Sequence, residues 1–255
     1  MAKLQALLFD VDGTIADTEE LHRQSFNHAF LRSNLKWEWS PALYAELLSI
    51  SGGHDRLAVY IDRLDEPADE KERLRQLIPH IHQTKTYEFG VRLEDRSLQP
   101  RPGVVRLIEE ASAAGIKIGF ASTSAWTNVS ALVAAVFGSS TSFEIGAIAG
   151  ADMVARRKPA PDVYRLLMSM LRVPAEACVA FEDSANGVAA AHAAGIFVVA
   201  TPSQWTAGQD FSLADLVLPT LGDPAAMLGV DDAARLGGAR WFSLGEAGAL
   251  SARTS

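Results

Sequence analysis

The sequence lacks the features that would indicate a disulfide-bonded, membrane-spanning or secreted protein. Cys178 is the only cysteine, so no internal disulfide can form, which is typical of a reducing compartment. No window approaches the length of a membrane-spanning helix, and the first residues lack the long apolar stretch of a secretory signal. We therefore expect a cytoplasmic protein without a membrane partner, in which Cys178 is a small buried core residue.

Positive charge is also scarce relative to negative charge. Lys and Arg total 23 against 31 Asp and Glu, the net charge is -8, and long basic runs are absent. Because this average field repels a polyanion, we do not expect a nucleic acid partner. A small anionic substrate stays possible, since a few cations can reverse the sign inside a cleft. The 255 residues, 48% of them hydrophobic, suffice for one large domain or two modest ones, and we expect a monomer.

Short apolar runs alternate with helical patterns over most of the chain. Buried strands are predicted at residues 6–9, 116–121, 177–181, 196–200 and 216–218. Helices are predicted between them at residues 104–114, 161–171 and 184–194. This alternation predicts an α/β fold, a Rossmann-like parallel sheet with helices on both faces. In such sheets, ligands bind beyond the carboxyl ends of the strands.

One segment interrupts the alternation and contains only helical patterns. Four helices are predicted at residues 18–32, 41–48, 54–64 and 69–87. We expect residues 1–16 and 99–255 to form the α/β core and residues 17–98 to form an inserted all-α cap domain. The two short linkers, near residues 16–17 and 99–102, would let such an insertion act as a lid.

The sequence Asp10-Val11-Asp12-Gly13-Thr14 follows the first predicted strand. Asp10 and Asp12 can point into one small space, where two like charges require a cation or a shared proton. Mg²⁺ prefers a few carboxylates together with water and a substrate phosphate. The alternative is a solvated acidic turn.

Two other candidates follow the second strand or precede a helix. Ser122, with Thr123 and Ser124, offers hydroxyls and backbone N–H groups that can hold phosphate oxygens, although an ordinary helix cap has the same composition. Lys158 precedes the helix at residues 161–171 and can neutralise a phosphate, although an isolated lysine is more often a surface cation.

The pair Glu182-Asp183 ends the third predicted strand. It can complete a magnesium shell, or Asp183 can simply cap the helix that begins at Ser184. Together, the four motifs indicate one functional site more strongly than any of them alone, because each lies at a strand end or helix start and their chemical roles are complementary.

The four motifs resemble those of the haloacid dehalogenase superfamily over residues 4–220, and the insertion is similar to the helical cap of its β-phosphoglucomutase-like subgroup. Dehalogenating members generally lack the second aspartate, so Asp12 indicates phosphoryl transfer. The resemblance implies a Mg²⁺-dependent phosphatase in which Asp10 attacks phosphorus and Asp12 is the acid and base. It implies that Asp10, Asp12 and Asp183 hold Mg²⁺ and that Glu182 orients a metal-bound water. Ser122 and Lys158 would stabilise the transferring group.

Several segments also resemble CbbY-type phosphatases of Calvin-cycle organisms, namely residues 17–22, 50–57, 121–124 and 157–162. That similarity implies a phosphorylated sugar as substrate, xylulose-1,5-bisphosphate, which inhibits carbon fixation and would be converted to xylulose 5-phosphate. The candidate substrate-binding residues are Asp17, His22, Ser51, Gly52, Gly53, His54, Arg56, Lys85, Thr123 and Ser124.

Two rival functions and a simpler reading of the cap stay open. A sugar phosphomutase would share every core residue and differ in how the cap shields the aspartyl phosphate from water. A catalytically silent binding or regulatory module would not need the complete set of motifs. In the cap, His22 can be a structural residue of an amphipathic helix, and Arg56 and Lys85 can be surface charges.

Overall fold

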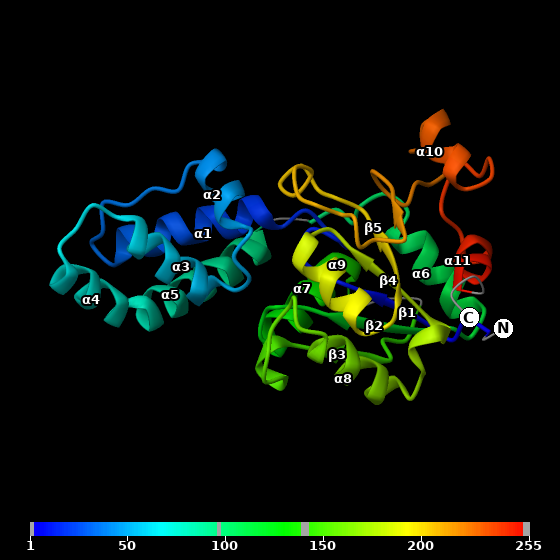
Figure 1. Cartoon of the computed structure of the whole chain (residues 1–255), viewed down its shortest axis with the longest axis horizontal. Helices are drawn as coiled ribbons and strands as arrows, with labels where there is room; N and C mark the ends of the chain where they lie inside the picture. The colour runs from blue at the N-terminus through cyan, green and yellow to red at the C-terminus, as the bar shows by residue number, and fades with distance from the viewer. Residues whose placement is uncertain (1–2, 96–97, 139–142, 252–255) are drawn as a thin grey trace. The chain divides into compact units, whose positions relative to one another are not determined.

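The computed structural model describes residues 3–95, 98–138 and 143–251. The chain divides into two compact units, one made of Met1–Asp17 with Leu98–Ser255 and the other of Thr18–Ser97. The first unit contains a sheet with helices, and the second contains helices (Figure 1).

The first unit is built on a six-stranded parallel sheet with the strand order β3-β2-β1-β4-β5-β6. The strands are β1 (Ala6–Phe9), β2 (Lys117–Ala121), β3 (Ala147–Ala149), β4 (Cys178–Glu182), β5 (Phe197–Ala200) and β6 (Leu216–Val217). The central strand β1 pairs with both β2 and β4, so that Phe9 lies opposite Phe120 and Phe181. The chain segments that follow β1, β2 and β4 therefore leave the sheet at one edge.

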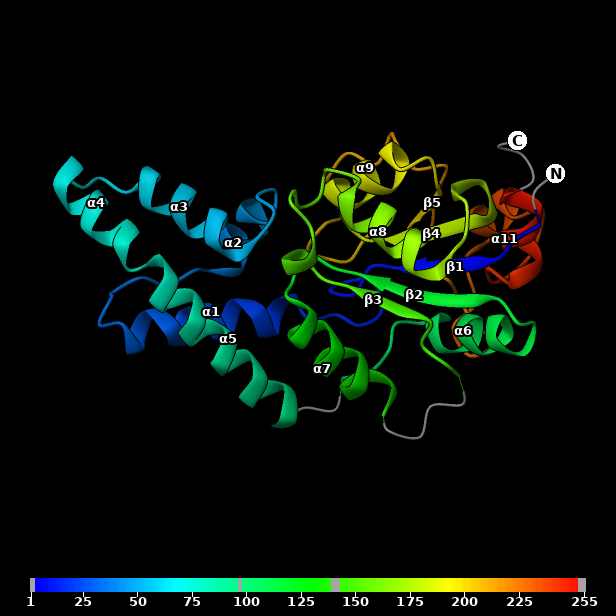
Figure 2. The same ribbon diagram turned by 90° about the horizontal axis from the view of Figure 1, so that it is seen from below.

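Helices cover both faces of this sheet (Figure 2). Helices α6 (Val104–Ala113) and α7 (Trp126–Phe137) lie on one face, and α8 (Asp162–Leu171) and α9 (Ala185–Ala193) lie on the other. Two further helices, α10 (Val230–Arg235) and α11 (Leu244–Ser251), follow the sheet, and α11 packs against α6 and β4.

Side chains alternate between the two faces, as expected for strands that are buried on both sides. Leu8 and Ala180 join the apolar cluster that includes Val163 and Leu167 of α8. On the opposite face, the ring of Phe181 stacks on Phe9 at a centroid distance of 4.6 Å and meets Phe242 edge-on at 5.6 Å. The predicted α/β fold is therefore confirmed. The edge strand β3 was not predicted, because its three residues are too few to show a strand pattern.

The described residues of the second unit form five helices with an aromatic core. They are α1 (Glu19–Arg32), α2 (Pro41–Leu47), α3 (Gly53–Arg63), α4 (Ala68–Gln76) and α5 (Ile78–Asp95). Helices α1 and α5 pack along each other. Trp39 and Tyr44 are fully buried, and the ring of Trp39 lies 4.6 Å from Phe26 and 4.9 Å from Phe30 between centroids. The all-α insertion is confirmed by these elements.

The prediction of one helix over residues 69–87 is wrong, because two helices occupy this region. Helix α4 ends at Gln76 and is capped by Leu77, after which α5 begins at Ile78. Pro79 lacks a backbone N–H and cannot continue α4, whereas a proline is tolerated in the first turn of α5. The proline was the signal for this boundary.

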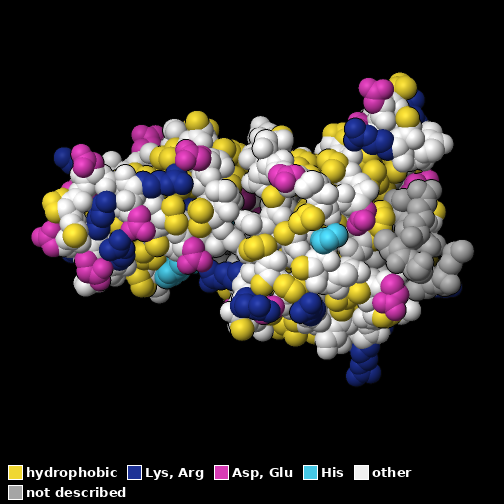
Figure 3. All heavy atoms as spheres, in the orientation of Figure 1, with side chains coloured by type: hydrophobic (Ala, Val, Ile, Leu, Met, Phe, Trp, Pro, Cys, Tyr) yellow, Lys and Arg dark blue, Asp and Glu magenta, His cyan; other side chains and the backbone are white. Residues whose placement is uncertain are grey.

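Across the described ranges, no helix combines the length and the apolar composition needed to cross a bilayer. On the face of the molecule that Figure 3 shows, basic and acidic side chains are interspersed over the helical unit.

Candidate active site

Asp10 lies at the carboxyl end of β1, at the centre of the sheet. Its backbone N–H continues the β1–β4 pairing by donating to the carbonyl of Phe181 at 2.9 Å. Its buried carboxylate accepts hydrogen bonds from Lys158 Nζ at 2.6 Å on Oδ1 and from Thr14 Oγ1 at 3.1 Å on Oδ2. The carboxylate is thus held in one orientation by two neighbours.

Lys158 is a buried cation in the segment that leads into α8. Its ammonium group donates to Asp10 Oδ1 and to Glu182 Oε1, both at 2.6 Å, and to the carbonyl of Ala121 at 3.1 Å. It also lies 5.1 Å above the ring of Tyr164. The three donors of the lysine are therefore all used, and the charge faces two carboxylates.

Three carboxylates converge around one small volume. Asp10, Glu182 and Asp183 are all buried, and each offers one oxygen within 4.8 Å of the oxygens of the other two. Among the described residues, Glu182 Oε2 has no hydrogen-bond partner. A hard divalent cation fits this donor set, because carboxylate oxygens are its preferred ligands and it would offset the repulsion between like charges.

Gly13 allows the acidic cluster to close. Its φ is +85°, and a Cβ at this position would lie 2.2 Å from Asp183 Oδ2. Any other residue would therefore combine a strained backbone with a steric clash against the carboxylate. This glycine follows Asp12 directly, which explains why the acidic motif includes it.

The charge balance of the cluster is negative. Burial raises the pKa of Asp10 well above its ordinary value, because Lys158 lowers it less than burial and the neighbouring carboxylates raise it. The pKa of Lys158 is also raised: burial acts to lower it, but Asp10 and Glu182 together outweigh that effect. Both members of the pair hold their protons more tightly, which is the signature of a site that lacks positive charge.

Asp12 and the predicted serines lie beside this cluster. Ser122 Oγ and Ser124 Oγ are each 3.5 Å from Asp12 Oδ2, and the backbone N–H of Ser124 donates to Ser122 Oγ at 3.0 Å. Thr123 is half-buried between them. The structure thus brings together the residues of all four motifs, which are 173 positions apart at their extremes, from Asp10 to Asp183.

The structure adds residues that the sequence did not single out. Tyr164 of α8 is fully buried and donates its hydroxyl to Glu182 Oε1 at 2.5 Å, and Thr14 contacts Asp10. Thr206 donates to Asp183 Oδ2 at 3.3 Å. Thr14 lies within the first motif, but the other two hydroxyls follow no pattern that separates them from ordinary buried polar residues.

In the linkers, Asp17 is exposed and its Oδ1 lies 3.7 Å from Nε of Arg101. Asp17 therefore forms an ion pair with the linker segment that returns to the sheet.

His22 and Lys85, both in the helical unit, lie in direct contact. Lys85 Nζ is 2.7 Å from His22 Nδ1, and the ammonium group lies 5.2 Å and 5.1 Å from the ring centroids of Phe26 and Phe89. The His22 ring is buried and stacks on Phe89 at 4.1 Å. These two candidates therefore form one polar group on an aromatic surface.

The remaining candidates of the helical unit surround the start of α3. Gly52 has a φ of +89° and caps the helix. A Cβ on Gly53 would lie 2.8 Å from the His82 ring, which is 4.6 Å from the His54 ring between centroids. Ser51 precedes the two glycines and is half-buried.

Arg56 is engaged within the helical unit rather than being a free surface charge. It donates to the carbonyls of Leu47 and Ile50 at 3.1 and 3.2 Å and to the Tyr44 hydroxyl at 3.1 Å. The side chain therefore holds the turn that leads to Gly52.

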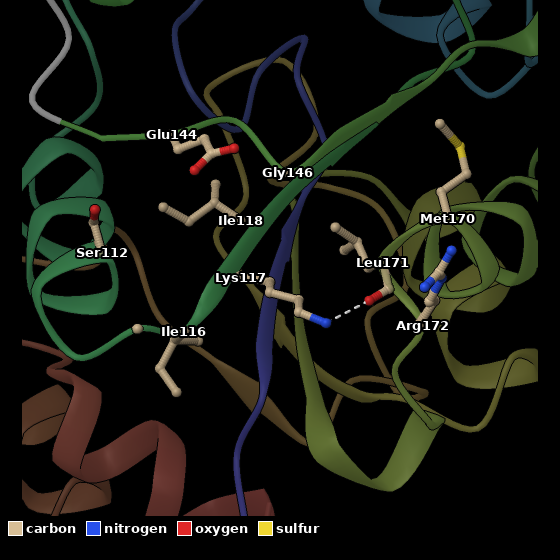
Figure 4. Close-up of a pocket in the computed structure, with 10 residues that line it drawn as sticks. Ser112, Ile116, Lys117, Ile118, Glu144, Gly146, Met170, Leu171 and Arg172 are labelled. Carbon is tan, nitrogen blue, oxygen red and sulfur yellow. Dashed lines mark hydrogen bonds between the residues drawn. The ribbon is translucent and has the colours of Figure 1, made fainter.

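A pocket lies at the end of the sheet opposite to the acidic cluster (Figure 4). It surrounds the start of β2, where Lys117 donates to the carbonyl of Leu171 at 2.7 Å. Ser122 follows the other end of the same strand. This pocket is therefore separate from the acidic cluster.

Comparison with known proteins shows which family the chain belongs to. A family model for haloacid dehalogenase-like hydrolases matches residues 4–195. Protein CbbY from Rhodobacter capsulatus is 43% identical over 224 residues, which are 88% of this chain and 96% of that protein. A mutant of CbbY from Rhodobacter sphaeroides, crystallised in complex with xylulose-(1,5)bisphosphate, has a TM-score of 0.78 at 40% identity, covering 87% of this chain and 98% of that one.

A β-phosphoglucomutase from Clostridium difficile is more distant, with a TM-score of 0.64 at 22% identity over 84% of this chain and 90% of that one. This likeness shows a shared fold. The match to the family model over most of the chain and the identity to the CbbY proteins show more: the chain belongs to the haloacid dehalogenase-like hydrolase family and is a phosphatase of that family.

Proposed function

We propose that the protein is a Mg²⁺-dependent phosphatase that converts xylulose-1,5-bisphosphate to xylulose 5-phosphate and inorganic phosphate. The observation that carries the choice of substrate is the complex of the Rhodobacter sphaeroides CbbY mutant with this bisphosphate, at 40% identity over nearly the whole of that chain. In an organism with a Calvin cycle, the reaction would remove an inhibitor of carbon fixation.

Asp10 is the proposed nucleophile. One of its carboxylate oxygens forms a bond to phosphorus while the bond from phosphorus to the sugar oxygen breaks, which gives an aspartyl phosphate. Lys158 at 2.6 Å and Thr14 at 3.1 Å support this role, because they fix the carboxylate before the substrate arrives. Asp12 would give its proton to the departing sugar oxygen, a transfer typically worth about 10²–10⁴ in rate.

Hydrolysis of the aspartyl phosphate completes the cycle. Asp12 would take a proton from a water molecule whose oxygen attacks phosphorus, the bond to Asp10 breaks, and inorganic phosphate leaves with Asp10 regenerated. The position of Asp12 supports this assignment, because its carboxylate lies 3.5 Å from the Ser122 and Ser124 hydroxyls and close enough to Asp10 to raise the pKa of that carboxyl.

Mg²⁺ would be held by Asp10, the main-chain carbonyl of Asp12 and Asp183, with Glu182 orienting a water molecule beside it, and when bound it supplies positive charge to the phosphate oxygens. The fit of the acidic cluster to a divalent cation supports this part of the proposal. Ser122 and Lys158 would hold the other oxygens of the transferring group, and electrostatic stabilisation of this kind dominates phosphoryl transfer.

We assign substrate choice to the cap, residues 17–98, and chemistry to the core, residues 1–16 and 99–255. The proposed sugar and distal-phosphate contacts are Asp17, His22, Ser51, Gly52, Gly53, His54, Arg56, Lys85, Thr123 and Ser124. For Arg56, the bonds to two carbonyls indicate that it acts partly by shaping the turn before Gly52.

The test measures phosphate release from a panel of sugar phosphates with Mg²⁺, using wild type, Asp10→Asn and the control Asp231→Asn. Asp231 is exposed in α10 and contacts none of the four motifs. We expect a clear preference for xylulose-1,5-bisphosphate, full loss of turnover in Asp10→Asn with an unchanged unfolding temperature or a small shift, and wild-type turnover in the control. Equal release from all sugars contradicts the substrate, turnover in Asp10→Asn contradicts the nucleophile, and an isomerised product without free phosphate indicates a mutase.

A further inference from the structure

Arg101 is a buried arginine in the linker that returns to the sheet, and its guanidinium gathers backbone carbonyls from three loops. Its Nη1 donates to the carbonyls of Gly13 at 2.6 Å and Thr201 at 2.5 Å, and its Nη2 donates to those of Pro202 and Pro219, both at 3.1 Å. The Gly13 carbonyl lies in the loop after β1, those of Thr201 and Pro202 lie in the loop after β5, and that of Pro219 lies in the loop after β6. The side chain therefore joins three loops at the carboxyl edge of the sheet.

Two of these three loops touch the carboxylate of Asp183. Gly13 lies so close to it that a Cβ would be 2.2 Å from Asp183 Oδ2. In the loop after β5, Thr206 Oγ1 donates to the same oxygen at 3.3 Å. The Thr206 hydroxyl is itself fixed by the N–H of Ser203, at 2.9 Å, directly after the Pro202 carbonyl that Arg101 holds. One guanidinium thus fixes both segments that enclose Asp183.

The linker does not need this side chain to stay attached to the sheet. The backbone N–H of Arg101 already donates to the carbonyl of Ile15 at 2.9 Å, and Ala16 pairs with Pro100 in an antiparallel bridge. Burying a guanidinium is costly unless its donors are satisfied. The four carbonyls and the nearby Asp17 satisfy it, so its position is best explained by the loops that it joins.

We propose that Arg101 is a positioning residue that holds Asp183 in place for binding the divalent cation. The proposal rests on the proposed function, because it takes Asp183 as a ligand of that cation. Arginine suits the role since its planar fork can serve several carbonyls at fixed angles, whereas lysine offers one compact ammonium group on a flexible stem. Residues that orient a metal ligand typically contribute about 10–100-fold to metal affinity.

The test is the affinity of the full chain for Mn²⁺, measured by the electron paramagnetic resonance signal of the free ion, with competition by Mg²⁺. The test variant is Arg101→Lys, and the matched control is Arg106→Lys. Arg106 is also partly buried and donates to two backbone carbonyls, those of Gly222 at 2.9 Å and Phe242 at 2.8 Å, but it contacts no residue of the acidic cluster.

We expect Arg101→Lys to bind Mn²⁺ about 10–100-fold more weakly than wild type and Arg106→Lys to bind it as wild type does. Unfolding temperatures of both variants show whether the effect exceeds a general loss of stability. Wild-type affinity in a folded Arg101→Lys overturns the proposal, and so does an equal loss in both variants.

Two further variants test the loop that contacts Asp183 and the metal site separately. If Arg101→Lys does not fold, Thr206→Val tests the same loop, because it removes the hydroxyl from Asp183 and leaves the carbonyls joined by Arg101 intact; unchanged Mn²⁺ affinity in Thr206→Val overturns the proposal. Asp183→Asn separates the two levels of inference. Unchanged binding in Asp183→Asn contradicts the proposed metal site itself, whereas loss in Asp183→Asn with wild-type binding in Arg101→Lys contradicts only the role of Arg101.

Discussion

Replacing Lys158 by methionine removes the charge that faces Asp10 and Glu182 while keeping most of the apolar stem. Both carboxylates stay buried after the change, and the Lys158 ammonium group is their shared partner at 2.6 Å. Removing one partner of a buried ion pair costs about 3–5 kcal/mol, because the remaining charge is left without compensation. For a protein of this size, each kcal/mol lowers the unfolding temperature by about 2–4 °C, so the expected drop is about 6–20 °C.

The stability deficit of Lys158→Met should depend on pH, and the sign of this dependence follows from the pKa of Asp10. Without Lys158, the folded-state pKa of Asp10 rises further above its unfolded value near 4, because burial and the repulsion from the Glu182 and Asp12 carboxylates then act without an opposing positive charge. A group with a raised folded pKa contributes stability that is present below its unfolded value and is lost as the pH rises through its folded value. The difference between wild type and variant should therefore be small near pH 4–5 and largest near pH 8.

The assay is urea unfolding of wild type and Lys158→Met at pH 5 and pH 8 in the presence of EDTA. Lys117→Met is the matched control, because Lys117 is exposed and its ammonium group donates to a neutral carbonyl, that of Leu171. We expect the control to lose less than about 1 kcal/mol at either pH, the net worth of a neutral hydrogen bond. A deficit in Lys158→Met that is the same at both pH values, or that is below about 1 kcal/mol at pH 8, would refute the reasoning.

Two other predictions follow from close packing. Gly13→Ala should lower Mn²⁺ affinity and phosphatase activity together, because its Cβ would lie 2.2 Å from Asp183 Oδ2 at a φ of +85°, whereas Gly208→Ala, with open space around it, should change neither. Cys178 should resist alkylation at pH 8 until the protein is unfolded in urea, because burial raises the pKa of its thiol to about 12. Rapid modification of the folded protein at a rate similar to the unfolded one would contradict the buried position of this thiol.

The core of the site could be predicted because its residues come directly after strands. Asp10, Ser122 and Glu182 each end or follow a short apolar run, and parallel strands bring their carboxyl ends to one edge. Strand ends are recognisable in a single sequence, so the convergence of distant motifs can be inferred from the alternation of elements alone.

Residues that contribute from within a helix or a linker could not be predicted in this way. Tyr164 has the spacing of an ordinary core residue of α8, and only the fold shows that its hydroxyl reaches Glu182. Arg101 lies in a linker whose sequence suggests only a hinge, yet its side chain contacts loops from about 88 to 118 positions away. Such contacts depend on the exact path of several loops, and no local pattern encodes that path.

Two glycines leave room for the carboxylates of the acidic cluster. A Cβ on Gly187 would lie 1.8 Å from Glu182 Oε2, just as one on Gly13 would lie 2.2 Å from Asp183 Oδ2. Gly187 has no positive φ and is inside α9, where glycine is unfavourable by about 1 kcal/mol relative to alanine, so local propensity does not explain it. Both glycines are explained if the Glu182 and Asp183 carboxylates must pack directly against the backbone of Gly187 and Gly13. This packing keeps the two negative charges close to each other. Such packing raises the repulsion between the carboxylates and lowers the stability of the fold. A bound divalent cation would offset this repulsion, so the close packing at both glycines is best explained by a cation site.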